Sequence, residues 1–186
     1  MISKNSKQLT VIEVFDFCEL RKEESSGHLG LFSRKNFSIG DLVINFGSSE
    51  ILSTPNYLTV QIGVNQHILM SPEYLQFTNH SCNPNLLYNT ATMELECLRT
   101  ISVGDEFTFF YPATEWKMSQ KFECQCGEID CIGLVQGAAD TPVEILKKYK
   151  ETDNLVNAVE AGISSDDLHK DNIGVNKSGN IVVIDC

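Results

Sequence analysis

The sequence predicts a mainly β protein made of many short strands. Up to residue 111, short runs rich in β-branched and aromatic residues recur along the chain. Gly, Pro, Asn and Asp residues, which favour turns, separate these runs. Segments with strand and helix character do not alternate there, so a doubly wound nucleotide-binding fold is not expected.

The expected elements follow from these local patterns. A charged turn is expected at residues 21–26 and a loop at residues 48–55. Ser71 is expected to cap one helical turn that has Pro72 at its first position. The segments expected to form strands are 10–17, 42–46, 57–62, 67–70, 86–89, 93–99 and 107–111.

Residues 138–186 have a different pattern. A helix is expected to begin at Asp140-Thr141-Pro142 and to continue with helical spacing as far as Gly162. Segments 172–175 and 180–185 flank Lys177-Ser178-Gly179 and predict a β-hairpin. Residues 167–185 also resemble the catalytic loop of kinase-like phosphotransferases, but this tail is too short to supply a phosphate-binding lobe. A plain hairpin is the better interpretation.

Composition limits the possible functions. The chain has 186 residues and is 42% hydrophobic and 21% charged, as expected for one globular domain with a short appendage. We expect no signal peptide and no membrane span, and therefore an intracellular protein of the nucleus or cytoplasm. The net charge of −11 argues against direct nucleic-acid binding. It permits a basic partner, although acidity can also serve solubility alone.

The cysteines point to a metal site. There are seven, and an odd number without a secretory signal argues against a disulfide framework. Cys124, Cys126 and Cys131 form a C-x-C-x4-C pattern, whose thiolates could converge on one tetrahedral ion. A structural zinc needs a fourth ligand from elsewhere, and Cys82 is the natural candidate.

Cys82 lies in an unusually polar stretch, residues 77–85. It reads Phe-Thr-Asn-His-Ser-Cys-Asn-Pro-Asn and shows neither helical nor strand periodicity. Amide, imidazole, hydroxyl and thiol groups follow one another within four residues. In a purely structural alternative, Asn and Ser only cap turns and the His-Cys pair is inert.

Four motifs in order resemble one family. Residues 79–85 are similar to the NHSCxPN signature of SET-domain protein lysine methyltransferases, and residues 104–111 are similar to that family's GEELTFDY signature. The cysteine cluster resembles its post-SET zinc motif, and residues 27–33 resemble its glycine-containing cofactor segment. The resemblance covers roughly residues 9–137.

The resemblance implies a specific architecture. It implies several small sheets and a knot-like crossing where the segment of Tyr111 passes residues 79–85. The expected parts are a SET domain at 9–120, a post-SET zinc-binding segment at 121–137, and an appendage at 138–186 with a helix and a hairpin.

The resemblance also assigns roles to residues. Tyr111 matches the catalytic tyrosine, and Cys82, Cys124, Cys126 and Cys131 match the zinc ligands. S-adenosylmethionine would be bound by His28, Leu29, Gly30, Asn79, His80 and Leu134, and the substrate channel would be lined by Phe109, Trp116 and Tyr57. His28 and Phe110 depart from the family pattern, since Phe110 replaces the usual Asp.

The implied function is methyl transfer from S-adenosylmethionine to the side-chain amine of a protein lysine, with histone tails as a candidate substrate. Phe109 lies at the family's Phe/Tyr position, and the smaller Phe implies di- or trimethylation. The alternative is a catalytically inactive SET module that binds zinc and recruits protein partners. Neither interpretation includes a membrane partner.

Overall fold

A computed structural model describes residues 8–63, 65–149, 173–175 and 181–183. Within these ranges the chain forms six small β-sheets, three short 3-10 helical segments and one short α-helix. The expectation of a mainly β fold with several small sheets is therefore confirmed. Among the described residues, no helix is long and apolar enough to cross a membrane.

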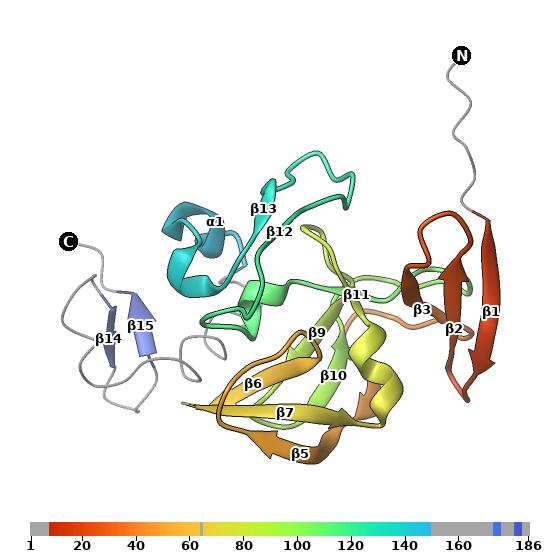
Figure 1. Cartoon of the computed structure of the whole chain (residues 1–186), viewed down its shortest axis with the longest axis horizontal. Coiled ribbons are helices and arrows are strands. Elements are labelled where there is room, and N and C mark those ends of the chain that lie inside the picture. Colours follow the sequence, from red (N-terminus) through yellow and green to blue (C-terminus); the bar gives the residue numbers. More distant parts are fainter. Residues whose placement is uncertain (1–7, 64, 150–172, 176–180, 184–186) are drawn as a thin grey trace.

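The first sheet contains β1 (Leu9–Val14), β2 (Cys18–Glu23) and β3 (Leu29–Ser33), all antiparallel. It lies at one side of the molecule, in red on the right of Figure 1. The expectation of a turn at residues 21–26 is wrong for its first half, because residues 21–23 pair with β1 and residues 21–22 also pair with β3. In β2, Cys18 and Leu20 are buried, whereas the charged residues are half-buried or exposed.

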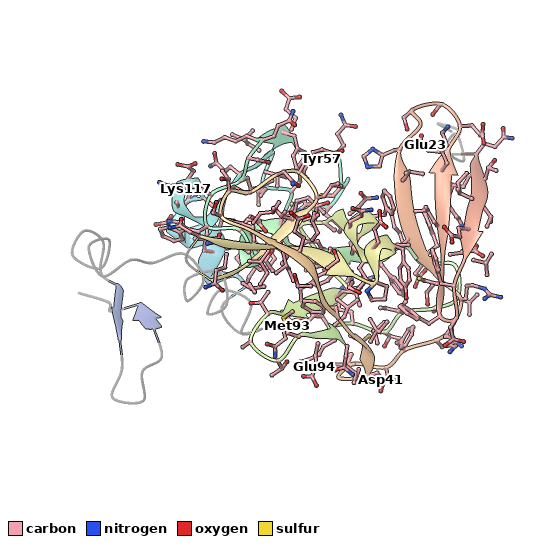
Figure 2. The ribbon with its side chains drawn as sticks, turned by 60° about the horizontal axis from the view of Figure 1, so that its bottom comes forward. Glu23, Asp41, Tyr57, Met93, Glu94 and Lys117 are labelled. Atoms are coloured by element: carbon pink, nitrogen blue, oxygen red, sulfur yellow. The ribbon has the colours of Figure 1, made fainter. Side chains whose placement is uncertain are left out.

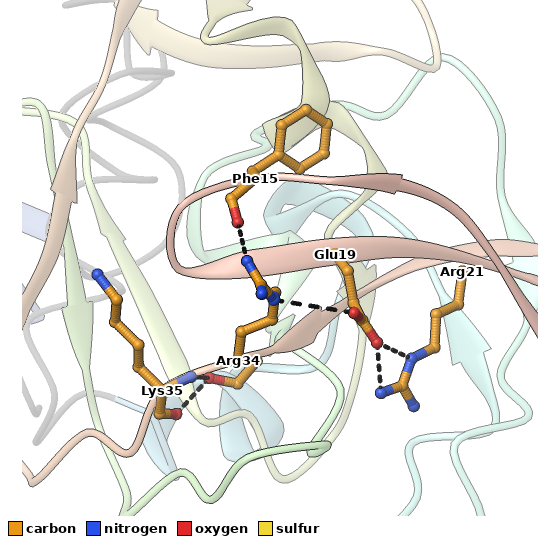
Figure 3. Close-up of polar contacts among 6 residues, drawn as sticks. Phe15, Glu19, Arg21, Arg34 and Lys35 are labelled. Atoms are coloured by element: carbon orange, nitrogen blue, oxygen red, sulfur yellow. Dashed lines mark hydrogen bonds and ion pairs between the residues drawn. The ribbon is translucent and has the colours of Figure 1, made fainter.

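Polar contacts tie this sheet to the segment that leaves it. Figure 3 shows Arg34 donating a 2.8 Å hydrogen bond to the carbonyl of Phe15 and approaching Glu19 at 4.0 Å. Glu19 also pairs with Arg21 at 2.7 Å, and the Arg21 guanidinium lies 4.5 Å from the ring centre of Phe32. The Arg34 contacts fix the chain after β3 to β2 and to the turn that precedes it.

A second sheet has the strand order β5 (Gly47–Leu52), β7 (Gln66–Ser71) and β6 (Thr59–Gly63). The expected loop at 48–55 is wrong, because most of this segment pairs with β7. Its Ser and Glu residues are largely exposed, as suits an edge strand, and pairing overrides their weak strand propensity. The third sheet contains β4 (Leu42–Asn45), β10 (Glu94–Cys97) and β9 (Leu86–Asn89), close to the expected ranges.

The main core lies between these sheets. Leu31, Ile68, Leu86, Leu95 and Ile101 are completely buried, one or more from each sheet and its flanking loops. Aromatic rings extend this core toward the site, where the Phe46, Tyr88, Phe109 and Tyr111 rings contact in sequence. The core thus packs against Phe109 and Tyr111 of the second motif.

Two motif segments meet in a short parallel pair. β8 (Asn79–His80) pairs with β11 (Thr108–Phe109), with Asn79 opposite Thr108 and His80 opposite Phe109. The segments are close in space although about thirty residues separate them, and the knot-like crossing stays a prediction. Before β8 runs the 3-10 segment η1 (Glu73–Phe77), which begins after Pro72 without a side-chain cap, so the expected Ser71 cap is wrong.

The chain after the second motif covers the site from another side. It contains η2 (Tyr111–Ala113), β12 (Phe122–Glu123) paired with β13 (Leu134–Val135), η3 (Ala138–Asp140) and α1 (Val143–Lys147). In Figure 1, β12, β13 and α1 lie together at the upper left of the main body. β14 (Ile173–Val175) and β15 (Ile181–Val183) form an antiparallel pair within the expected hairpin. The rest of the expected helix, to residue 162, and most of the kinase-like stretch lie outside the described residues.

Candidate functional site

A cleft of about 1190 Å³ opens beside the β8–β11 pair. Most of its lining comes from the β2–β3 turn, the segment before β6, the two motif segments, and residues 118–128. Tyr57 and Glu23, which both line it, lie along the same upper edge of the molecule in Figure 2. Six residues singled out in the sequence as cofactor, channel or catalytic groups line it: His28, Tyr57, Asn79, His80, Phe109 and Tyr111.

Tyr111 begins η2 and turns its ring into the cleft. Its hydroxyl donates a 3.1 Å hydrogen bond to the carbonyl of Thr78, and its ring lies 4.6 Å from the ring of Phe109. Burial raises the pKa of Tyr111 well above its usual value, and the charges of Glu106 and Glu115 act in the same direction. The phenol therefore stays neutral and can orient a substrate, but it cannot act as a base near pH 7.

His80 links Tyr111 to the cysteine cluster. Its Nδ1 accepts a hydrogen bond from the backbone N–H of Tyr111 at 3.3 Å, and its Nε2 lies 3.4 Å from the sulfur of Cys82. Burial lowers the pKa of His80 to about 4, so the ring is neutral. Since Nδ1 accepts, Nε2 carries the proton and donates it toward the sulfur.

Asn79 is held by three partners. Its amide nitrogen donates to the carbonyl of Leu29 at 2.9 Å and to the carboxylate of Glu106 at 2.7 Å, while its oxygen lies 3.3 Å from Nε2 of His28. Gly30 makes this arrangement possible. A Cβ at Gly30 would lie 2.6 Å from the Glu106 oxygen and 2.9 Å from the Asn79 nitrogen.

Asn85 connects the two motifs through the backbone. Its amide nitrogen donates to the carbonyl of Glu106 at 2.8 Å, and its oxygen accepts the N–H of Thr108 at 2.8 Å. Asn85 is buried and makes the bonds that a neighbouring strand would otherwise make. The last Asn of the first motif therefore fixes the register of the second.

The four cysteines singled out in the sequence converge. The sulfurs of Cys82, Cys124, Cys126 and Cys131 all lie within 4.8 Å of one another, and those of Cys82 and Cys124 are 3.7 Å apart. Sulfurs at about 2.3 Å from a tetrahedral zinc lie roughly 3.8 Å apart, so the spacing fits that ion.

The surroundings of the cluster also suit a cation. Backbone N–H groups of Ile132 and Gly133 point at the sulfurs of Cys82 and Cys131, at 3.4 and 3.5 Å. Burial raises the pKa of Cys82 strongly and that of Cys124 to about 11, so without a cation these thiols hold their protons. The donor set is thus suited to a metal that displaces thiol protons.

The C-terminal segment packs directly behind this cluster. The Tyr149 hydroxyl donates to the carbonyl of Cys82 at 2.6 Å, and the Tyr149 ring stacks on Phe110 with centroids 3.6 Å apart. Phe110, Trp116, Ala138, Ile132, Ile145 and Leu146 belong to the same second core. This explains Phe110, since an Asp there would place a charge against an aromatic ring in a fully buried position.

Some residues singled out in the sequence are not among the residues that line the cleft. Leu29 and Gly30 lie just behind Asn79, as described above, and Leu134 pairs with Glu123 in the β12–β13 pair. Trp116 packs against the second core. The roles assigned to these four residues stay predictions.

Sequence reasoning missed a buried carboxyl in the cleft wall. The carboxylate of Glu115 accepts the N–H of Gln61 at 2.9 Å, and the Gln61 side chain accepts the N–H of Trp116 at 2.9 Å. Burial raises the pKa of Glu115 to about 8. Its only sequence signal is a position four residues after Tyr111, which no pattern distinguishes from a surface Glu.

The cleft is acidic overall. Its lining includes one arginine, Arg99, and no lysine, whereas its carboxylates are Glu23, Asp105, Glu106, Glu123 and Glu128, with the buried carboxyl of Glu115 beside them. Such a lining attracts cations and repels phosphates. The charge and the aromatic rings together suit a positively charged side chain that enters the cleft toward Tyr111.

Comparison with known proteins identifies part of the chain. The family model described as the SET domain matches residues 28–112, which include β3 to η2 and both motif segments. This segment is homologous to SET methyltransferases, as its small sheets and the meeting of the two motifs lead one to expect.

Several proteins that match part of this chain are fungal methyltransferases. The chain is 43% identical over 95 residues to the methyltransferase flvH of Aspergillus flavus, which is 50% of this chain and 53% of that protein. It is 35% identical over 77 residues to a histone-lysine N-methyltransferase, H3 lysine-36 specific, of Candida albicans, with 38% of this chain and 9% of that protein covered. The corresponding protein of Kluyveromyces lactis is 34% identical over 86 residues, with 43% and 12% covered.

The chain thus spans about half the length of the flvH protein and about a tenth of the two lysine-36 enzymes. The activities for which these relatives are named are those of the whole proteins.

Proposed function

We propose that this chain transfers a methyl group from S-adenosylmethionine to the side-chain amine of a protein lysine. The observation that carries the proposal is the meeting of Tyr111 and Phe109 with Asn79 and His80 in one acidic cleft, within the segment that matches the SET domain. The homologous histone-lysine methyltransferases support lysine as the acceptor.

The reaction requires a neutral amine. At an ordinary pKa near 10.4, only about one lysine in 2,500 is neutral at pH 7. The cleft can raise this fraction, because the rings of Phe109 and Tyr111 exclude water from the amine and favour its uncharged form. The neutral Tyr111 hydroxyl can then point the nitrogen lone pair at the methyl carbon.

S-adenosylmethionine would supply the methyl group as a sulfonium, whose positive charge suits the acidic lining. Asn79 and His80 on β8, with the backbone of His28, Leu29 and Gly30, are the proposed residues for holding it. The amine lone pair forms the new bond to the methyl carbon, and the electrons of the broken carbon–sulfur bond stay on sulfur. The product ammonium loses a proton to return to the neutral amine.

The four cysteines would hold one zinc ion. Segment 121–137 has few buried side chains, so metal binding would supply much of the free energy that orders it. It contributes Phe122, Glu123 and Cys124 to the cleft wall, and its proposed role is to close the cofactor side of the site. We also propose that the chain has three parts, with boundaries at 9–120, 121–137 and 138–186.

The test is transfer of a labelled methyl group to core histones and to a mixed protein extract. Tyr111→Phe should lower the transfer rate by at least about a hundredfold, as loss of a positioned hydroxyl donor does elsewhere. Tyr74→Phe is the matched control, because Tyr74 stacks on Phe15 outside the cleft. Full activity in Tyr111→Phe would refute the assigned role.

Failure of the wild-type protein to methylate any substrate, while it carries zinc and binds S-adenosylmethionine, would favour the recruiting module. The substrate protein is proposed to be basic, with histone tails as the first candidates and the nucleus or cytoplasm as the site of action.

A further inference from the structure

Six carboxyl groups line the cleft, and they differ in their surroundings. Glu23, Glu106 and Glu128 are half-buried, and Asp105 and Glu123 are exposed. Glu115 differs from all of them, because its side chain is buried while it still forms part of the cleft wall. A buried carboxyl is costly, so it is kept where it has partners or a ligand.

Glu115 is fixed rigidly beside Tyr111. The backbone N–H of Glu115 donates to the carbonyl of Tyr111 at 3.1 Å, and its own carbonyl accepts the N–H of Ala138 at 2.8 Å. The carboxylate accepts the N–H of Gln61 on β6 at 2.9 Å. Tyr111 and Ala138 therefore hold the backbone of Glu115, and the Gln61 N–H holds its carboxylate in the wall of the cleft that Tyr111 also lines.

Other groups cannot take its place. Tyr111 stays protonated, so it cannot accept a proton. Glu106 already accepts a hydrogen bond from the amide nitrogen of Asn79. The uncharged donors around Glu115, the Gln61 N–H and the Thr114 hydroxyl, favour its ionised form without neutralising it.

We propose that Glu115 binds the ammonium group of the incoming amine and accepts one of its protons. The proton moves from nitrogen to a Glu115 oxygen, and the electrons of the broken N–H bond become the lone pair that attacks the methyl carbon. The carboxylate becomes a carboxylic acid, and solvent takes up its proton before the next turnover. This inference rests on the proposed function, which identifies the amine as a protein lysine side chain.

The energetics suit a transfer in this direction. In a buried pocket, loss of water disfavours both the ammonium and the carboxylate, so the neutral amine and neutral acid lie closer in free energy to the ion pair than they do in water. The raised pKa of Glu115 and the lowered pKa expected of a buried amine bring the two groups close together on the pH scale. Proton transfer between them then costs little.

The titratable and polar groups on the elements around Glu115 do not account for its raised pKa. On η2 the titratable group is Tyr111, and on β6 the facing group is the uncharged Gln61. η3 carries Asp140, which pairs with Lys121 at 3.0 Å. None of these charges is among the causes that shift the Glu115 carboxyl.

The test follows the Glu115 carboxyl directly by carbon-13 NMR of the full chain labelled at glutamate side chains. The signal is assigned by its absence in Glu115→Gln, in which the amide oxygen can still accept the Gln61 N–H. The probe is n-butylammonium chloride, with n-butanol as the uncharged probe of the same length. Butylammonium should lower the pKa of Glu115 by more than about one unit, and n-butanol should not.

Affinity for butylammonium should fall at least about tenfold in Glu115→Gln. It should fall less in Glu123→Gln, which removes an exposed charge from the same cleft. An unchanged Glu115 titration, an equal response to both probes, or equal losses in the two variants would each overturn the proposal. These measurements need no methyl transfer, so they can fail while the methyltransferase assay succeeds, and the reverse.

Discussion

Replacing Gly30 by Ala tests whether the hydrogen bond between Asn79 and Glu106 organises the cofactor side of the cleft. The new methyl group would lie 2.6 Å from the Glu106 oxygen and 2.9 Å from the Asn79 nitrogen, distances that real contacts do not reach. Both atoms end flexible side chains, so the backbone of β3 need not move. The side chains must separate, and their 2.7 Å bond is lost.

The cost follows from the bond that is lost. A hydrogen bond to a charged group contributes about 1.5–3 kcal/mol, and we expect the free energy of unfolding to fall by roughly that amount. Because Asn79 and the backbone of residues 28–30 are the proposed cofactor contacts, S-adenosylmethionine should also bind more weakly. Urea denaturation measures the first effect, and isothermal titration of S-adenosylmethionine measures the second.

Gly47→Ala is the matched control, because Gly47 also lies in a strand and a Cβ there would meet its nearest atom at 3.9 Å. It should change stability by less than about 0.5 kcal/mol. If Gly30→Ala were as stable as the control and bound S-adenosylmethionine normally, the close approach at Gly30 would have no energetic role and the reasoning would be refuted.

Further predictions concern the other parts of the site. Gly137→Ala should destabilise the protein more than Gly30→Ala in urea denaturation, because its Cβ would meet the backbone of Trp116 and Lys117, which cannot move aside. A chelator should remove one zinc per chain and expose residues 121–137 to protease, whereas unchanged cleavage would contradict metal ordering. Phe109→Tyr should restrict the product to monomethyl-lysine by mass spectrometry, since a hydroxyl takes up space beside Tyr111. The raised pKa of Glu115 stabilises the fold below about pH 4.5, and this contribution disappears as the pH rises through about 8. Glu115→Gln should flatten that part of the stability profile, and parallel profiles would contradict it.

Part of the site could be predicted from the sequence because its chemistry is local. Three cysteines within eight residues, with Cys82 in a dense polar stretch, led to the cluster whose sulfurs converge within 4.8 Å. The two motifs likewise led to Tyr111, which the structure brings beside Asn79 and His80. Strand ranges such as 86–89 were also correct, because apolar residues there are contiguous and bounded by turns.

Other expectations failed where pairing outweighed propensity. Segment 48–55 is rich in Ser and looks like a loop, but β7 supplies hydrogen bonds that make most of it an edge strand. Segment 21–23 is charged and looks like a turn, but β1 and β3 bind it on both sides. Such pairing depends on partners that are distant in sequence, and local composition does not encode them.

The sequence by itself determined the mainly β class, the four cysteines and the two motif segments, because each depends on residues a few positions apart. Only the tertiary structure decided that Gly30 makes room for the bond between Asn79 and Glu106, and that Tyr149 packs on Phe110 behind the cysteines. It also decided that Glu115 is buried in the cleft wall by Gln61, which lies 54 residues earlier. Burial is a property of the whole packed chain, and with it comes the shift in pKa that gives an ordinary Glu its proposed chemistry.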